Sequence, residues 1–239
     1  MNKINPYHQQ IPVLIAVDCI IFGYDGEDLK ILLVKRGFEP QKDCWSLMGG
    51  FIEENENLYC AAERILFHCT GLKQVYLEQL KSYGAPDRDP VGRTISVAYY
   101  ALIDINKYQK QITDAYHAEW FLWNEAPKLI FDHDKMVDKA KERIRHKAAL
   151  YPILFELLPE KFTIPQLQNL YEQVYDIKMD NRNFIRKINA TKLLIKLQEK
   201  DKSSSRRGAF LYQLDKEKYK SKSDSSLNFI PTPENLLSF

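Results

Sequence analysis

The chain of 239 residues is long enough for one large domain or two modest ones. Its composition, 45% hydrophobic and 28% charged, is ordinary for a globular protein, and no apolar run of about 18 residues that would span a membrane is present. The four cysteines form no CxxC pair and the first residues lack an apolar signal core, so we expect a reducing, cytoplasmic location.

The net charge of +2 conceals an uneven distribution. Residues 1–150 contain 19 Lys and Arg against 21 Asp and Glu, whereas residues 178–222 contain 14 basic and 5 acidic residues. A strongly basic segment attached to a neutral body indicates a module that binds a polyanion such as nucleic acid. A solvated basic surface without a partner is the alternative that charge alone leaves open.

Two apolar runs near the start of the chain predict a β-hairpin. The runs VLIAVDCIIF and LKILLVKR, at residues 13–22 and 29–36, are separated by GYDGED. The Asp25-Gly26 pair in this linker favours the positive-φ turn that connects hairpin strands. Similar runs predict further strands at residues 75–82, 93–103 and 118–123.

The helix predicted next is defined by its ends. Residues 58–70 follow Asn57, which can cap the first turn, and precede Gly71, which fits the left-handed residue after a helix. A second helix, rich in alternating charge, is expected at residues 133–147. Because strands predominate around these helices, the first half favours an α+β or α/β sandwich.

The chain after Tyr151 predicts two further helices. Residues 163–166, TIPQ, form a capping box with a proline in the first turn, and apolar residues then recur as on an amphipathic helix. The next helix begins after Asp180, a good capping residue. Its inner apolar stripe is expected to comprise Phe184, Ile185 and Ile188.

Two alternating runs at residues 193–200 and 209–214 predict strands on either side of the polar loop DKSSSRRG. Helix, turn, helix and basic hairpin together outline a winged helix-turn-helix, which we place at residues 151–215. Residues 216–239 then form a polar tail.

The polar face of the second of these helices carries side chains suited to DNA. Arginine and asparagine can read guanine and adenine edges, whereas lysine and the loop arginines suit phosphates or a minor groove. The expected DNA-contacting residues are Asn181, Arg182, Asn183, Arg186, Lys187, Arg206 and Arg207. A solvent-exposed face on a helical protein-interaction domain is the alternative.

A degenerate motif surrounds the helix at residues 58–70. The stretch GGFIEENENLYCAAERILFHCTGL resembles the Nudix box, a loop–helix–loop motif of enzymes that cleave phosphate compounds. Its scaffold positions match at Gly50, Glu56, Arg64, Leu66, Gly71 and Leu72. The three glutamates that follow the arginine in that motif are replaced by Ile65, His68 and Cys69.

These replacements remove the cluster of carboxylates that would bind a metal ion in the motif. Positions 65, 68 and 69 share one helix face, where three carboxylates would hold Mg²⁺ or Mn²⁺. Isoleucine ligates nothing, and one histidine and one cysteine are too few for zinc. Weak metal binding through Glu53 or Glu54 in the preceding loop stays open. We therefore expect no Nudix hydrolysis, no catalytic residue, no bound metal and no cofactor.

The likeness extends beyond the box. SYGAPDRDPVGRTISVAYYALI, FLWNEAP and FDHD in the first half, with LPEKFTIPQLQNLYEQVY and DNRNFIRKI in the second, resemble the NrtR family of Nudix-related transcriptional regulators. The likeness covers residues 11–214 and is closest to the arabinose-responsive, AraR-like branch. It implies a Nudix-like α/β/α sandwich over residues 1–150 that senses an effector, followed by a winged helix that binds operator DNA.

A sugar effector such as L-arabinose would need hydrogen-bonding groups beside an aromatic wall. Asp18 interrupts an apolar strand, so its carboxylate needs a partner, for which Lys35, Arg36, Arg93 or a ligand are the candidates. The expected effector-binding residues are Asp18, Lys35, Trp45, Arg93, Tyr99 and Glu119. The alternatives are internal pairing of Asp18, a core position for Trp45, and a loop braced by Arg88 and Arg93.

The expected function is a sugar-responsive repressor that acts as a homodimer, binds a near-palindromic double-stranded DNA operator and has no membrane partner. Two alternatives stay open. One is a regulator of NAD metabolism that senses ADP-ribose, and the other is an active Nudix hydrolase with displaced metal ligands.

Overall fold

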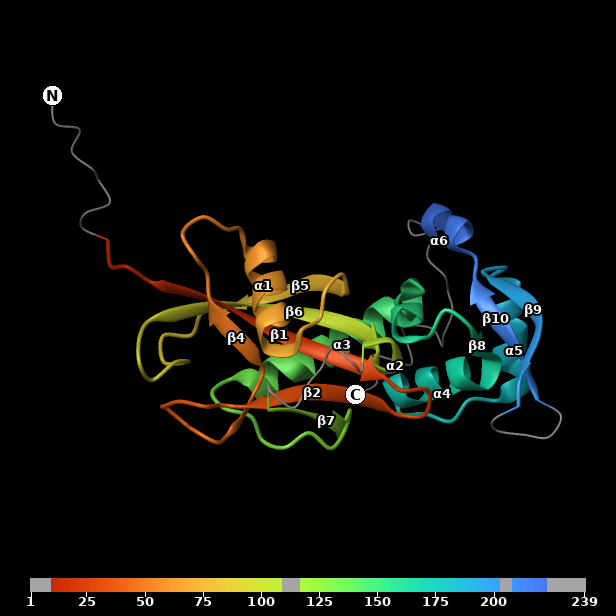
Figure 1. Cartoon of the computed structure of the whole chain (residues 1–239), viewed down its shortest axis with the longest axis horizontal. Helices are drawn as coiled ribbons and strands as arrows, with labels where there is room; N and C mark the ends of the chain where they lie inside the picture. Colours follow the sequence, from red (N-terminus) through yellow and green to blue (C-terminus); the bar gives the residue numbers. More distant parts are fainter. Residues whose placement is uncertain (1–9, 109–116, 203–207, 223–239) are drawn as a thin grey trace, which may run out of the picture.

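The computed structural model describes residues 10–108, 117–202 and 208–222. The chain is elongated, with a layered sandwich at one end and a winged helix at the other (Figure 1). Within these ranges no helix is both long enough and apolar enough to cross a membrane.

Strand β1 (Leu14–Tyr24) is the central strand of a seven-stranded sheet. It pairs in parallel with β6 (Thr94–Asp104) along its whole length. On its other side it pairs antiparallel with β4 (Met48–Phe51) and then with β2 (Leu29–Lys35). Most of β1 is buried between layers on both faces, which explains its nearly continuous apolar run.

The remaining strands extend the sheet at its edges. β5 (Tyr76–Tyr83) pairs with β6, whereas β3 (Trp45–Ser46) and β7 (Ala118–Leu122) pair with β2. The predicted hairpin is confirmed, because the turn between β1 and β2 contains Gly26 at φ +105°. β3 and β4, of two and four residues, were not predicted because such short strands show no detectable alternation.

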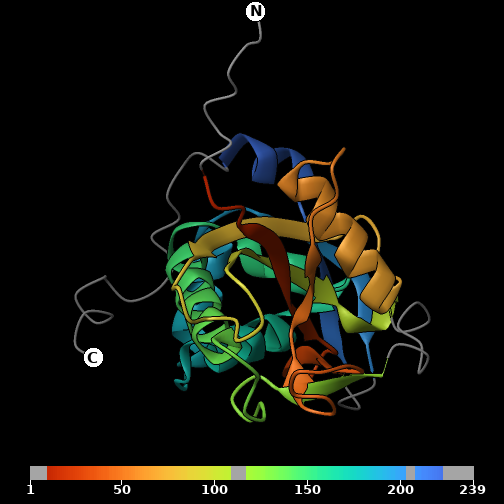
Figure 2. The ribbon, with the colours of Figure 1, turned by 90° about the vertical axis from the view of Figure 1, so that its left-hand side faces the viewer.

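Helices α1 (Leu58–Thr70) and α3 (His133–Leu150) cover opposite faces of the sheet (Figure 2). The ends predicted for α1 are confirmed: the Asn57 side chain accepts from the Cys60 N–H at 2.9 Å, and Gly71 follows the helix at φ +77°. A separate apolar core lies beneath each helix. The first half is therefore an α/β/α sandwich, with α2 (Ile105–Tyr108) as a single turn after β6.

The winged helix follows a 3₁₀ turn at Ile153–Leu157. Helices α4 (Ile164–Tyr175) and α5 (Asn181–Ala190) begin with the predicted capping box at Thr163 and the predicted Asp180 cap. Three strands, β8 (Phe162–Thr163), β9 (Leu194–Asp201) and β10 (Ala209–Leu214), form a sheet in the order β8-β10-β9. The predicted tail begins with helix α6 (Lys216–Lys222), which composition did not predict.

Helix α4 is hydrogen-bonded to the turn between β1 and β2, and we call this contact the hairpin latch. The side-chain amides of Asn169 and Gln173 each donate to the carbonyl oxygen of Glu27 at 2.7 Å. The Leu29 N–H donates to Gln173 Oε1 at 2.7 Å, and the Tyr24 hydroxyl lies 3.2 Å from Asn169 Nδ2. The latch therefore joins the end of β1 and the start of β2 to the winged helix.

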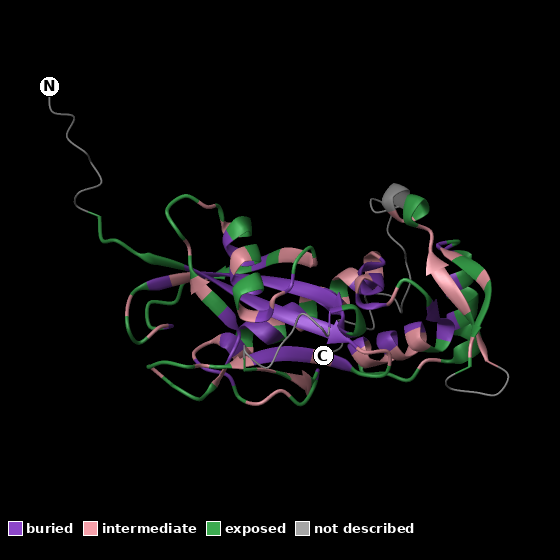
Figure 3. Cartoon of the chain, viewed as in Figure 1, coloured by how far each residue is buried: buried purple, intermediate pink, exposed green. Residues whose placement is uncertain are grey.

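A second contact joins the C-terminal end of α4 to α3. Arg145 Nε donates to the carbonyl oxygen of Val174 at 2.7 Å, and the Tyr175 hydroxyl donates to the carbonyl oxygen of Arg145 at 2.6 Å. The apolar core under α3 continues into the winged helix, because α4 and α5 contribute buried residues to the same cluster, and Figure 3 marks buried residues in both parts. The sandwich and the winged helix thus share one core.

Candidate functional site

Arg64 of α1 braces the loop before the helix. Its Nε donates to Glu56 Oε2 at 2.9 Å, its Nη2 donates to the Phe51 carbonyl oxygen at 2.9 Å, and its Nη1 lies 3.4 Å from Glu53 Oε1. Hydrogen bonding to Arg64 lowers the pKa of Glu56 to about 2. Both carboxylates are therefore engaged with a guanidinium, which competes with metal coordination.

The positions that replace the box glutamates do not fit a divalent ion. Ile65 is buried, and a Cβ on Gly50 would lie 3.1 Å from its Cγ1, so this position packs the helix onto the loop. His68 is exposed and Cys69 is half-buried, and burial raises the pKa of the Cys69 thiol. Among the described residues, no group of three or more His, Cys, Asp or Glu side chains is placed to share a metal ion.

A cavity of about 460 Å³ opens beside these residues. It lies between the first half of β1, the end of β2, β4, the end of α1 and the start of α3. Its polar lining comprises Asp18, Lys35, Arg36, Ser46, His68, Arg88, Asp89, Thr94 and His133. The aromatic lining comprises Phe38, Phe51 and Phe131.

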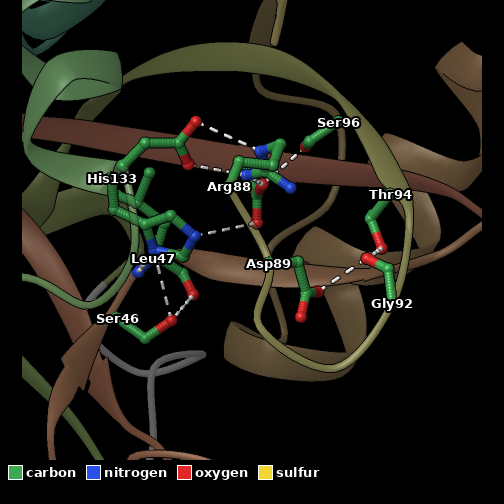
Figure 4. Close-up of polar contacts among 10 residues, drawn as sticks. Ser46, Leu47, Arg88, Asp89, Gly92, Thr94, Ser96 and His133 are labelled. Atoms are coloured by element: carbon green, nitrogen blue, oxygen red, sulfur yellow. Dashed lines mark hydrogen bonds and ion pairs between the residues drawn. The ribbon is translucent and has the colours of Figure 1, made fainter. Parts of the chain in front are cut away.

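The buried carboxylate of Asp18 lines the floor of the cavity. Figure 4 shows three of its neighbours, Arg88, Ser96 and His133. Asp18 Oδ2 accepts from Ser96 Oγ at 2.5 Å and lies 3.6 Å from Arg88 Nη2, while Asp18 Oδ1 lies 3.7 Å from His133 Nε2. A Cβ on Gly49 would lie 2.3 Å from Oδ1, so only glycine leaves room for this carboxylate. Asp18 thus has internal partners, but they are not Lys35, Arg36 or Arg93 as expected.

Arg88 connects Asp18 to Asp132, the residue that precedes α3. Its Nε and Nη2 donate to the two oxygens of Asp132 at 3.1 and 2.8 Å, a bidentate pair. The Arg88 side chain is 4% exposed, so its charge is compensated almost entirely by these two carboxylates. This contact pins the loop between β5 and β6 over the sheet.

His133 occupies the same floor as a neutral ring. The Leu47 N–H donates to its Nδ1 at 3.2 Å, which leaves the proton on Nε2, facing Asp18. Burial lowers the pKa of His133, and the nearby carboxylates only partly oppose this effect.

Two of the six residues expected to bind an effector line the cavity. Asp18 is at the floor, and Lys35 is exposed at the edge, with its Nζ 5.0 Å from the centroid of the Trp45 ring. Trp45 itself packs against the core and makes an edge-to-face contact with Phe121. The alternative that Trp45 is a core residue describes its position better.

The other three expected residues lie away from the cavity. Arg93 is exposed and donates to the Ala85 carbonyl oxygen at 3.1 Å, so it braces a loop. Tyr99 is buried in the core under α1, where its hydroxyl donates to Gln79 Oε1 at 3.2 Å. Glu119 is exposed on β7.

The cavity also contains residues that sequence reasoning did not assign to an effector site. The sequence suggests only a loop-bracing role for Arg88, and His133 falls within the FDHD segment that carries the family resemblance. For Arg36 the sequence suggests only pairing with Asp18. A polar residue directly after a buried strand, or at the start of a helix, was the signal that could have identified Arg36 and His133.

Helix α5 presents the predicted DNA-contacting face. Its polar residues Asn181, Arg182, Asn183, Arg186 and Lys187 are all exposed. Arg186 Nη2 donates to Asn183 Oδ1 at 3.1 Å, so these two side chains lie together. Phe184 and Ile188 are buried as predicted, whereas the expectation for Ile185 is wrong, because it is 37% exposed at the edge of the stripe. Arg206 and Arg207 lie outside the described residues.

The winged-helix sheet adds cations that sequence reasoning missed. The Nζ atoms of Lys196 and Lys200 on β9 lie 3.8 and 4.5 Å from the centroid of the exposed Phe210 ring on β10. Neither lysine makes an ion pair within the described parts of the chain. A polyanion near this sheet would relieve the repulsion between the two ammonium groups.

Two regions of the chain match known families. Residues 12–140 match the NUDIX domain, and residues 154–214 match the NrtR DNA-binding winged helix domain. The chain is 36% identical over 204 residues to the ADPR responsive transcriptional repressor NtrR of Acinetobacter baylyi, an overlap of 84% of this chain and 81% of that protein. It is 39% identical over 136 residues to an ADP-ribose pyrophosphatase of Methanocaldococcus jannaschii, an overlap of 57% and 78%.

Solved structures of Shewanella oneidensis NrtR are among those similar to the chain. The structure of Shewanella oneidensis NrtR complexed with a 27mer DNA has a TM-score of 0.77 and 31% identity, covering 89% of this chain and 96% of that one. The NUDIX domain of the same protein complexed with ADP ribose has a TM-score of 0.51 and 34% identity, covering 56% and 90%.

Three of these four matches are named for ADP-ribose: the repressor, the pyrophosphatase and the NUDIX-domain complex. None of the four supports the expected arabinose-responsive branch. The order of domains, the overlap with a repressor and the exposed α5 face agree with one another. The chain therefore belongs to the NrtR family of transcriptional regulators, in which a Nudix domain precedes a DNA-binding winged helix.

Proposed function

We propose that this protein is an ADP-ribose-responsive transcriptional repressor, in which ligand bound in the Nudix cavity controls operator binding by α5. The observation that carries the proposal is the 36% identity to a repressor described as ADPR responsive, over 84% of the chain. This reading replaces the expected sugar effector. A single pentose would leave much of a cavity of about 460 Å³ unfilled.

The charges of the cavity suit a diphosphate better than a neutral sugar. Lys35 and Arg36 lie side by side at the end of β2, and neither makes an ion pair within the described ranges. Arg88, by contrast, is already paired with Asp132 and Asp18. Lys35 and Arg36 are thus the cations available to a ligand that carries two phosphates.

Three elements connect the cavity to the winged helix. Strands β1 and β2 line the cavity with Asp18 and Lys35 and end at the hairpin latch on α4. Helix α3 starts with His133 in the cavity, and Arg145 in its later turns contacts the end of α4. Ligand binding switches DNA affinity if the ligand prefers one arrangement of these elements over another.

Binding of operator DNA as a homodimer remains part of the proposal, as does the division of the chain at residues 150 and 215. A gel shift on DNA from upstream of the protein's own gene tests the function, with ADP-ribose and L-arabinose as separate additions. Release by ADP-ribose alone is expected. Release by L-arabinose alone, or no response to ADP-ribose, would contradict the proposal.

We propose further that the protein senses its ligand without cleaving it. Ile65, His68 and Cys69 offer no oxygen cage, and Glu53 and Glu56 are held by Arg64. The likeness to an ADP-ribose pyrophosphatase favours the competing reading, a hydrolase. Incubation with ADP-ribose and Mn²⁺ separates the two. Sustained turnover that is lost in Glu56→Gln would establish the hydrolase.

The recognition helix has its own test. We expect Arg186→Ala to weaken operator binding by about 1–3 kcal/mol and to flatten the preference at one base pair, because an arginine that reads a base supplies specificity. Lys161→Ala is the control, since Lys161 is an exposed cation paired with Glu199 at 2.8 Å and lies outside α5. Equal operator affinity of the wild type and Arg186→Ala would indicate that α5 is not part of the DNA-contacting surface.

A further inference from the structure

A line of contacting aromatic and cationic groups runs from the floor of the cavity to its mouth. The ring of Phe131 makes an edge-to-face contact with the ring of His133, with centroids 5.8 Å apart. The guanidinium carbon of Arg36 lies 5.5 Å from the Phe131 centroid and 4.0 Å from the Phe38 centroid. All four residues line the cavity. We call the three outer members, Phe131, Arg36 and Phe38, the Phe38 stack.

The Phe38 ring is held in place although it is exposed. Arg36 Nε donates to the Phe38 carbonyl oxygen at 3.1 Å, and its guanidinium covers one face of the ring. Phe38 is nevertheless 64% exposed, so the face away from Arg36 is open. A large apolar side chain held at the mouth of a polar cavity contributes little to folding and is available to a ligand.

The backbone of Phe131, the innermost member of the Phe38 stack, adopts an unfavourable conformation. Phe131 has φ +51°, in the left-handed region that bulky side chains rarely occupy. The neighbouring Asp132 is fixed by Arg88, and His133 by the Leu47 N–H. Such conformations persist where surrounding contacts impose them, and they concentrate at ligand sites.

We propose that the open face of Phe38 is the platform on which the purine base of the effector stacks. This inference rests on the proposed function, because it assigns one part of ADP-ribose to one part of the cavity. Every base has a π face that stacks on an aromatic ring, and a guanidinium behind the ring extends the stack. Lys35 and Arg36 adjoin the platform, so a diphosphate attached to the stacked nucleoside reaches both cations.

The assignment can be tested by separating the base from the rest of the ligand. Calorimetric titration of the full chain with ADP-ribose, AMP and ribose 5-phosphate compares ligands with and without a base. We expect Phe38→Ala to weaken the affinity for ADP-ribose and for AMP about tenfold, which corresponds to about 1.4 kcal/mol and lies within the usual range for a base stacked on an aromatic ring. Affinity for ribose 5-phosphate should stay as in the wild type, and Phe38→Trp should restore binding of both nucleotides.

Phe67→Ala is the matched control. Phe67 is also exposed, and Lys73 Nζ lies 4.2 Å from its centroid, but it does not line the cavity. Its replacement should leave all three affinities unchanged.

Unchanged affinity of Phe38→Ala for ADP-ribose would contradict the assignment, because no base would then stack on the ring. An equal loss of affinity for ribose 5-phosphate would also contradict it, because the ring would then contact the sugar. Failure of the wild type to bind ADP-ribose would instead remove the proposed function. In that case the affinity for AMP tests the stacking assignment. AMP binding that is weakened by Phe38→Ala would support stacking of the base on Phe38, and absence of AMP binding would contradict it.

Discussion

The polar floor of the cavity is made by Asp18, Arg88 and His133, which come from three separate parts of the chain, and Arg88 is also paired with Asp132. Burying one guanidinium between two carboxylates is tolerable only because hydrogen bonds satisfy each group. Removing Arg88 would leave the buried Asp18 carboxylate without its cation. The site is therefore most sensitive to substitution of these few buried polar residues.

For Arg88→Met we expect a loss of about 3–5 kcal/mol in the free energy of unfolding, because the buried carboxylate of Asp18 and the half-buried carboxylate of Asp132 would lose their cation. Urea denaturation measures this loss. Lys139→Met is the control, since Lys139 and Glu142 form an exposed pair at 2.7 Å, worth about 1 kcal/mol or less. A similar small effect in both variants would mean that water reaches the Arg88 pair.

His133 makes stability depend on pH. Burial lowers its pKa, so the folded protein keeps the ring neutral while the unfolded chain takes up a proton near pH 6.5. The stabilisation is therefore complete above about pH 6.5 and is lost as the pH falls. In His133→Asn, whose amide oxygen can accept from the Leu47 N–H, the free energy of unfolding should fall less between pH 7 and pH 5. Equal slopes in the two proteins would show that other groups cause the dependence.

At the scale of elements, helix ends and turns were predictable because they depend on neighbours in sequence. Asn57, Thr163 and Asp180 cap their helices as expected, and Gly26 adopts the positive φ of the hairpin turn. The exposure of Ile185 was not predictable from periodicity, because the width of a buried stripe depends on what packs against it.

The hairpin latch leads to a prediction about coupling between elements. Gln173 contacts both Glu27 and Leu29, so Gln173→Ala should loosen the link between the cavity strands and α4. We expect the variant to bind ADP-ribose and DNA separately, while ADP-ribose changes its DNA affinity less than in the wild type, with a loss of about 0.5–2 kcal/mol in coupling.

Fluorescence anisotropy of labelled operator, with and without ADP-ribose, measures this coupling. Gln168→Ala is the matched control, because Gln168 is on the same helix but contacts Glu172 and Met179. A full response to ADP-ribose in Gln173→Ala would show that the latch does not transmit the signal.

At the scale of the whole molecule, the sandwich and the winged helix share a core. Residues of the sheet, α3, α4 and α5 belong to one apolar cluster. We therefore expect a single cooperative thermal transition, with equal calorimetric and van't Hoff enthalpies. The three tryptophans all lie in the sandwich, so their fluorescence should report the same midpoint as helical circular dichroism. Two separate midpoints would indicate that the winged helix unfolds independently.

The sequence by itself determined the longer strands and helices, their order, the basic winged helix and the loss of the acidic metal ligands, because periodicity, caps and residue type are local properties. The parallel pairing of β1 with β6 brings Ser96 beside Asp18, and the packing of α3 brings His133 to the same floor. Those contacts join residues about 80 to 115 positions apart, and only tertiary packing decides which distant polar groups meet.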